Sequence, residues 1–148
     1  MKTLAFLAAL MPFPALAHVH VHPETAAPGA QVEIALKVGH GCAGAATTGL
    51  RVAIPAGLDA VQPLTLDGWQ VTIVSDVPGG RVTEIRWTGG TLEDAAKGSF
   101  AFAARIVQAN GELVLPVVQT CGPHEVRWIE TGAGQEHPAP VVKVTPGA

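Results

Sequence analysis

The 148-residue sequence contains no tyrosine, and aromatic residues make up only 5% of it. Charged residues are also scarce, at 14%, and the formal net charge is −3. A nucleic-acid-binding surface needs concentrated Lys and Arg, so this composition argues against one. Gly (17) and Pro (12) are too frequent for a long coiled coil. A hydrophobic content of 48% is ample for a folded core, and the length suits a single domain.

Long hydrophobic runs are absent except at the N-terminus. Residues 1–17 read MKTLAFLAALMPFPALA, with an early lysine, an apolar stretch too short to span a bilayer, and a closing Ala15-Leu16-Ala17. This order is typical of a secretory signal peptide with an A-x-A cleavage site. We therefore predict export to the periplasm, removal of residues 1–17, and a mature domain of residues 18–148 without a membrane span.

Methionine and cysteine each occur only twice. Met1 and Met11 both lie in the predicted signal peptide, so the mature chain has no thioether. Cys42 and Cys121 remain, and two cysteines in an exported chain are more typical of a disulfide than of a thiolate site. A Cys42–Cys121 bridge leaves the mature chain without the soft donors that select Cu(I).

The rest of the chain alternates between apolar and polar residues, with turn signals between the alternating stretches. These stretches are 19–22, 31–38, 50–54, 69–74, 81–87, 99–107, 113–119, 124–130 and 141–144. The pattern predicts an all-β antiparallel sandwich of about nine short strands. Only 92–97 has a composition that suits a helical turn, and residues 132–140 are predicted to be an ordered loop. Trp69 and Trp87 are expected in the core between the sheets.

The predicted cleavage makes His18 the first residue of the mature chain. A terminal histidine carries two metal donors, its α-amine and its ring Nδ1, which together close a six-membered chelate. Nitrogen donors of this kind suit Cu(II). A free α-amino group is acidic enough to lose its proton to a metal ion at neutral pH. We call this amine–imidazole pair the histidine brace.

A second arrangement competes, because the mature chain would begin His18-Val19-His20. A flexible terminus with a histidine in third position can wrap Cu(II) or Ni(II) in its amine, two deprotonated amides and that third imidazole. If residues 19–22 form a strand, those amides belong to a sheet and the brace is favoured. A strand also directs His18, His20 and His22 to one face, from which His20 can add an imidazole. Solvent exposure is the simpler interpretation for His20 and His22.

An ordered set of motifs runs through the mature chain. They are residues 17–23 (AHVHVHP), 40–47 (HGCAGAAT), 54–55 (IP), 68–69 (GW), 87–90 (WTGG), 119–121 (QTC), 127–128 (RW) and 138–140 (PAP). In this order and spacing they resemble the YcnI-like copper-binding domain family. The resemblance implies an exported immunoglobulin- or fibronectin-III-like sandwich that binds Cu(II) through a histidine brace, a nearby carboxylate and a tryptophan lining the site.

By this resemblance, the brace falls on His18 and the tryptophan on Trp128, which composition alone would assign to the core. An indole is not a usual Cu(II) donor, so its expected roles are to cover one axial face, exclude water and report copper by fluorescence quenching. The carboxylate position holds Ser99 in this chain. A hydroxyl is a poor Cu(II) ligand, so we expect water or another side chain there, with His20 as the first candidate.

Three acids are alternatives to His20 at that position: Glu93 and Asp94, which precede Ser99, and Glu130, which follows Trp128 by two residues.

The remaining histidines admit simpler interpretations. His40 precedes Cys42 in a glycine-rich turn, where it is either a second imidazole at the site or a loop histidine hydrogen-bonded near the disulfide. His124 and His137 lie in turns beside prolines, and we expect both to be solvent-exposed.

The sequence favours a periplasmic Cu(II) carrier or buffer that is not an enzyme and whose partners are other copper-handling proteins. An oxidative copper enzyme is an alternative, but such enzymes need a second histidine and a flat aromatic surface for sugar, and this chain is poor in aromatics. A second alternative is a β-sandwich domain that binds a protein partner and uses no metal. Hydrolysis has little support, because Ser75 and Ser99 are the only serines and neither lies in a nucleophile elbow.

Overall fold

The computed structural model of the protein describes residues 18–147, and the predicted signal peptide, residues 1–17, lies outside the described residues. The described residues form strands, turns and loops only. Residues 18–147 therefore contain no helix that is long and apolar enough to cross a membrane.

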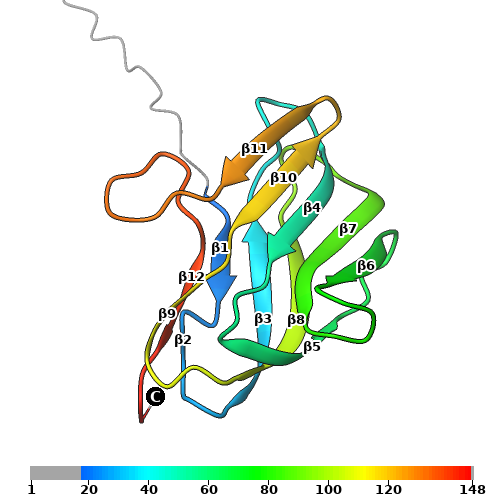
Figure 1. Ribbon diagram of the computed structural model, residues 1–148. Coiled ribbons are helices and arrows are strands. Elements are labelled where there is room, and N and C mark those ends of the chain that lie inside the picture. The colour runs from blue at the N-terminus through cyan, green and yellow to red at the C-terminus, as the bar shows by residue number, and fades with distance from the viewer. Residues whose placement is uncertain (1–17, 148) are drawn as a thin grey trace, which may run out of the picture.

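The strands form three sheets (Figure 1). In chain order they are β1 (His20–His22), β2 (Thr25–Ala26), β3 (Gln31–Val38), β4 (Thr47–Ala53), β5 (Leu58–Pro63), β6 (Gln70–Ser75), β7 (Val82–Leu92), β8 (Gly98–Ile106), β9 (Gly111–Val114), β10 (Val117–Cys121), β11 (His124–Trp128) and β12 (Val141–Val144). The strand orders are β1-β3-β8-β5, β11-β10-β4-β7-β6 and β2-β12-β9. All pairings are antiparallel except that of β2 with β12. The predicted β-sandwich is confirmed.

The core lies between the two larger sheets and is completed by Leu113, Val142 and Val144 of the three-stranded sheet. Their inward positions alternate along each strand, as the period of two requires. The largest fully buried side chains are Trp87, Phe100, Phe102, Ile34, Leu36, Leu58, Ile85, Ile106, Leu113, Leu115, Gln119 and Val38. Trp87 is thus a core residue as predicted. Trp69 is only half-buried, because it precedes the edge strand β6 and covers the rim of the core, edge-on to Phe100 at 5.0 Å between ring centroids.

Cys42 and Cys121 form the predicted disulfide, with a Cα–Cα distance of 5.8 Å. Cys42 lies in the turn between β3 and β4, and Cys121 is the last residue of β10. The bridge therefore ties the loop that joins β3 to β4 to the end of β10 in the five-stranded sheet.

The structure departs from the sequence prediction at three places. The predicted strand 113–119 is divided at Pro116 into β9 and β10, which belong to different sheets, because proline has no N–H to continue a ladder. The strand β5 was not predicted, since a bulge at Ala60 (φ 48°) breaks its alternation. Residues 92–97 form the end of β7 and a turn in which Ala96 N–H donates to Glu93 O, not a helical turn.

The ion pair between β5 and β8 lies away from the terminus. Arg105 donates from Nε to Asp59 Oδ1 at 2.8 Å and from a terminal nitrogen to Oδ2 at 2.5 Å. These hydrogen bonds and the guanidinium charge hold the pKa of Asp59 below its usual value. Because both side chains are solvent-accessible, the pair contributes little to stability.

Candidate metal centre

The start of the described chain is fixed by two buried valines. Val19 and Val21 are 4% and 7% exposed and pack into the core, while His20 and His22 point to solvent. The strand β1 pairs with β3, with Val21 opposite Leu36. His18, immediately before Val19, is therefore held at the end of the sandwich, half-buried.

The ring of His18 packs against Trp128, the last residue of β11. Their ring centroids are 5.9 Å apart and the planes meet at 72°, an edge-to-face contact. Nε2 of His18 is buried and has no hydrogen-bond partner. An ion arriving from solvent therefore cannot reach Nε2 without a ring movement. Nδ1, the nitrogen closer to the backbone, is not among the buried polar atoms without a partner.

Trp128 is both a core residue and a neighbour of His18. It is 4% exposed, and its Nε1–H donates to Oε1 of the buried Gln119 at 3.1 Å. Gln119 Nε2 in turn donates to His40 O and to Thr47 Oγ1, each at 2.8 Å. Both the oxygen and the nitrogen of the Gln119 side-chain amide are therefore hydrogen-bonded. This network fixes the indole of Trp128 in one orientation.

The role of Gln119 was not predicted. The sequence signal was a polar residue between Val117 and Cys121, the apolar residues at the neighbouring inward positions of β10. A buried amide needs hydrogen-bond partners, and Trp128 is one of them.

His137 contacts Trp128 as well, at 5.1 Å between ring centroids. The expectation that His137 is solvent-exposed is wrong: it is half-buried because its loop folds back over the indole. Glu130 closes the base of this loop, accepting from His137 N–H at 2.6 Å through Oε2 and donating its own N–H to His137 O at 3.1 Å. Glu130 thus has a structural role here. His124 is exposed, as predicted.

His20 lies beside His18, with ring centroids 6.3 Å apart. Two imidazoles on opposite sides of one ion, with metal–nitrogen bonds of about 2 Å, have centroids about 6 Å apart. The distance thus allows a shared ion. However, His20 is exposed and stands directly opposite Lys37 on β3, whose charge disfavours a cation there.

The structure does not bring Ser99 to His18. Ser99 lies on β8, opposite Lys37, and β3 separates it from β1. Its hydroxyl accepts from Lys37 Nζ at 3.0 Å. His20, Lys37 and Ser99 therefore occupy neighbouring positions on three adjacent strands, and the ammonium group of Lys37 lies between the other two side chains.

The acids expected near the site have other partners or positions. Asp94 Oδ1 accepts from Gly41 N–H at 3.1 Å, and Glu93, the residue before it, is exposed. His40 donates from Nδ1 to Gly41 O at 2.5 Å. This favours the interpretation of His40 as a loop histidine near the disulfide.

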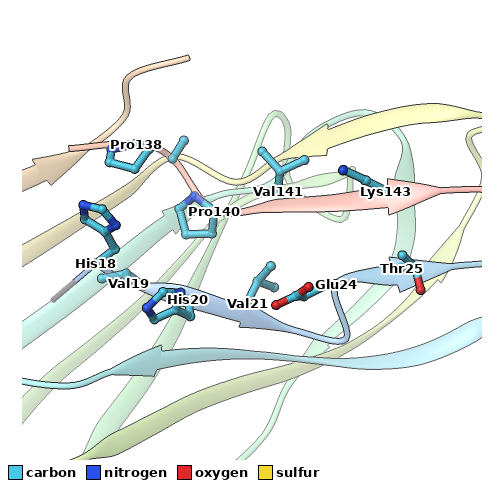
Figure 2. A pocket seen from close by; sticks show the side chains of 11 residues that line it. His18, Val19, His20, Val21, Glu24, Thr25, Pro138, Pro140, Val141 and Lys143 are labelled. Atoms are coloured by element: carbon cyan, nitrogen blue, oxygen red, sulfur yellow. The ribbon is translucent and has the colours of Figure 1, made fainter. Parts of the chain in front are cut away.

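A groove of about 300 Å³ runs from His18 along β1 and β12 (Figure 2). We call it the terminal groove. Its lining residues are His18, Val19, His20, Val21, Glu24, Thr25, Pro138, Ala139, Pro140, Val141 and Lys143. Glu24 is the acid here that sequence reasoning missed, because it follows the turn at Pro23 and not the strand that carries the histidines.

Side chains alone do not form a metal cage in residues 18–147, where no three His, Cys, Asp or Glu residues are grouped to hold an ion. A metal at this end needs a further donor. The α-amine that removal of residues 1–17 would free on His18 would be such a donor, adjacent to Nδ1 of the same residue. The donor set therefore fits a divalent ion that prefers nitrogen, with open positions left for other ligands.

Comparison with known structures supports the fold. An uncharacterized protein from Nocardia farcinica, whose crystal structure reveals an immunoglobulin-like fold, superimposes with a TM-score of 0.74 at 21% identity, covering 88% of this chain and 99% of that one. The reeler domain of human F-spondin has a TM-score of 0.50 at 10% identity, covering 89% and 93%. No curated protein matches the chain.

The family comparison covers nearly all of the described chain. A family described as a domain of unknown function, DUF1775, matches residues 18–144, beginning at the histidine that follows the predicted signal peptide. This is the YcnI-like family that the motifs resemble, so that prediction is confirmed. The chain belongs to the DUF1775 family, with an immunoglobulin-like β-sandwich fold.

Proposed function

We propose that the protein is an exported Cu(II)-binding protein that holds the ion through the histidine brace of His18. The observation that carries the proposal is the orientation of the His18 ring. Its Nε2 is buried at Trp128, which leaves Nδ1 beside the backbone nitrogen that signal-peptide removal would free. Those two nitrogens form the six-membered chelate.

The fold favours the brace over the wrapped-amide arrangement. Wrapping requires the first three mature residues to curl around one ion through the amides of Val19 and His20. Val19 is 4% exposed in the core, and His20 begins the strand β1. Wrapping would pull Val19 into water, at a cost of about 1.5–3 kcal/mol for an aliphatic side chain.

The oxidation state follows from the available donors. Cys42 and Cys121 are paired in a disulfide, and residues 18–147 contain no methionine. Nitrogen donors without thiolate or thioether favour Cu(II) over Cu(I). Reduction by ascorbate is therefore expected to release the metal.

A carrier or buffer is favoured over an oxidative enzyme. The three tryptophans are all at least half-buried, so none offers a flat exposed surface to a polysaccharide. His18 precedes β1 at one end of the sandwich, where we expect a bound ion to be within reach of partner copper-handling proteins.

The test compares three forms of the mature chain by calorimetric titration with Cu(II). The form that begins at His18 is expected to bind one ion. A form with one extra glycine before His18 has no free α-amine on that residue and is expected to bind roughly a hundredfold more weakly, about 2.7 kcal/mol. His18→Ala is expected to lose a similar amount.

His124→Ala is the matched control, because His124 is exposed at the start of β11 and belongs to no contact described at the site. It is expected to bind as the unaltered chain does. Equal Cu(II) affinity in the blocked and authentic forms would refute the brace.

A further inference from the structure

Two opposite charges line the far end of the terminal groove. Glu24 precedes β2 and Lys143 lies on β12, and both side chains line the groove some distance from His18 (Figure 2). Neither forms an ion pair with another residue in the described part of the chain, where the pairs are Arg51–Glu125, Arg86–Glu84, Arg105–Asp59 and Arg127–Glu125. An ammonium and a carboxylate in one groove, each without a charged partner, match the two charges of a zwitterion.

The backbone adds a donor and an acceptor between these charges and His18. Leu115 N–H donates to Pro140 O at 2.9 Å on the β9 side, and Lys143 N–H donates to Glu24 O at 2.8 Å on the β2 side. Successive residues of a strand direct their N–H and C=O groups to alternate edges. Val141, two residues before Lys143, therefore directs its N–H and C=O away from β9 and toward β1, across the groove.

The strands β1 and β12 lie side by side along this groove but are in different sheets and do not pair (Figure 1). The space between them is bounded by the apolar residues Val19, Val21 and Pro140. Its volume of about 300 Å³ is at the small end of the range for small-molecule sites. The terminal groove thus has charged side chains at one end, apolar side chains along its middle, and His18 at the other end.

We propose that the terminal groove binds a free α-amino acid with a metal-coordinating side chain. Its α-carboxylate pairs with Lys143 and its α-ammonium with Glu24, which directs its side chain along the groove toward His18. The metal part of this proposal rests on the proposed function: a Cu(II) ion on the brace takes a further ligand from the bound amino acid. Among residues 18–147, Glu24 is the one carboxylate that lines the groove.

The first test needs no metal. The mature chain, free of metal, is titrated with L-alanine and L-histidine while backbone amide shifts are followed by NMR. Both amino acids are expected to shift the amides of Glu24, Val141 and Lys143 with similar affinity. Acetate and ethylamine each carry one of the two charges and are expected to bind about tenfold more weakly, since a charge-assisted hydrogen bond is lost.

Charge-removing variants locate the site. Glu24→Gln and Lys143→Gln are each expected to weaken L-alanine binding about tenfold. Glu33→Gln and Lys97→Gln, exposed positions that do not line the groove, are the matched controls and are expected to leave it unchanged. Absence of shifts with either amino acid, or equal shifts with acetate alone, would overturn the proposal.

The second test adds Cu(II). With the ion on the brace, L-histidine is expected to bind about tenfold more tightly than L-alanine, and [15N-imidazole]histidine is expected to alter the nitrogen couplings of the protein-bound copper signal. Removal of copper from the protein as a free histidine complex would overturn the shared-ligand step. If the mature chain binds no copper, the proposed function fails, while the metal-free titration still decides the amino-acid site.

Discussion

At the scale of single residues, Trp128 joins the core to the candidate metal centre. Its indole N–H is anchored by Gln119 inside the sandwich, and its ring contacts both His18 and His137. The core assignment suggested by composition and the site assignment implied by the family resemblance describe the same side chain. A residue fixed by buried hydrogen bonds can give a metal site a rigid apolar wall without donating to the ion.

The position of Trp128 makes it the expected fluorescence reporter of copper. Cu(II) bound at His18 should quench the nearest indole most strongly. We expect Trp128→Phe to remove most of the copper-dependent loss of tryptophan emission. Trp69→Phe is the control, because Trp69 contacts Phe100 at the rim of the core and should leave the quenching in place. If quenching persists in Trp128→Phe and disappears in Trp69→Phe, the ion is not at His18.

Only some residues of the candidate metal centre could be predicted from the sequence. The A-x-A motif followed by histidine pointed to His18, and the family resemblance implied Trp128; the two rings are in contact. Glu24 and His137 were not placed near them, because a turn and a glycine-rich loop separate each from the strand that carries its neighbour. Ser99 lies far from His18 because β3 stands between β8 and β1 in the sheet. Alternation of apolar residues identifies strands but does not give their order.

At the scale of elements, the loop of residues 131–138 covers one side of Trp128. Its ends are joined by hydrogen bonds between Glu130 and His137, and Ala139 N–H donates to Glu130 O at 2.8 Å. These bonds hold together a loop whose residues 131–136 are exposed. The sequence prediction of an ordered loop before the last strand agrees with this arrangement.

Removal of the Glu130 carboxylate should loosen this loop without unfolding the sandwich. In Glu130→Ala the His137 amide loses its acceptor, so we expect faster hydrogen exchange at His137 and along residues 131–136. Glu136→Ala, an exposed acid in the same loop, is the control and should exchange as the unaltered protein does. Unchanged protection of His137 in Glu130→Ala would show that the loop is held by other contacts.

The strands themselves were largely predictable, and the exceptions have local causes. Alternation identified the long central strands β3, β4, β7 and β8, whose buried positions are mostly apolar, with Thr47 of β4 as a buried polar exception. It failed where the backbone departs from a regular ladder, as at Ala60, or where proline ends one ladder and the chain enters another sheet, as at Pro116. Sheet membership is set by packing between distant segments, so a single sequence does not show it.

At the scale of the whole molecule, the disulfide ties the network around Trp128 to the fold. Thr47 Oγ1, which accepts from Gln119, lies 3.9 Å from Cys121 Sγ. The bridge closes a loop with a sequence separation of 79. A loop of this length contributes about 4 kcal/mol in the chain-entropy account.

Replacing both cysteines should therefore lower the free energy of unfolding substantially. For Cys42→Ala combined with Cys121→Ala, we expect a loss of about 4 kcal/mol in urea denaturation monitored by circular dichroism. The unaltered protein with its disulfide reduced is the matched comparison and should lose a similar amount. A loss under about 1 kcal/mol in both would mean that the unfolded chain gains little freedom from breaking the bridge.

The central claim is that the α-nitrogen of His18 is a copper ligand, and pulsed EPR on the mature chain labelled with [α-15N]histidine tests it most directly. The account predicts a strong 15N coupling in the copper signal of the form beginning at His18, together with one imidazole coupling from the same residue. That 15N coupling should vanish when a glycine precedes His18. A copper signal without 15N coupling in the authentic form, or one that survives the added glycine, would contradict the account.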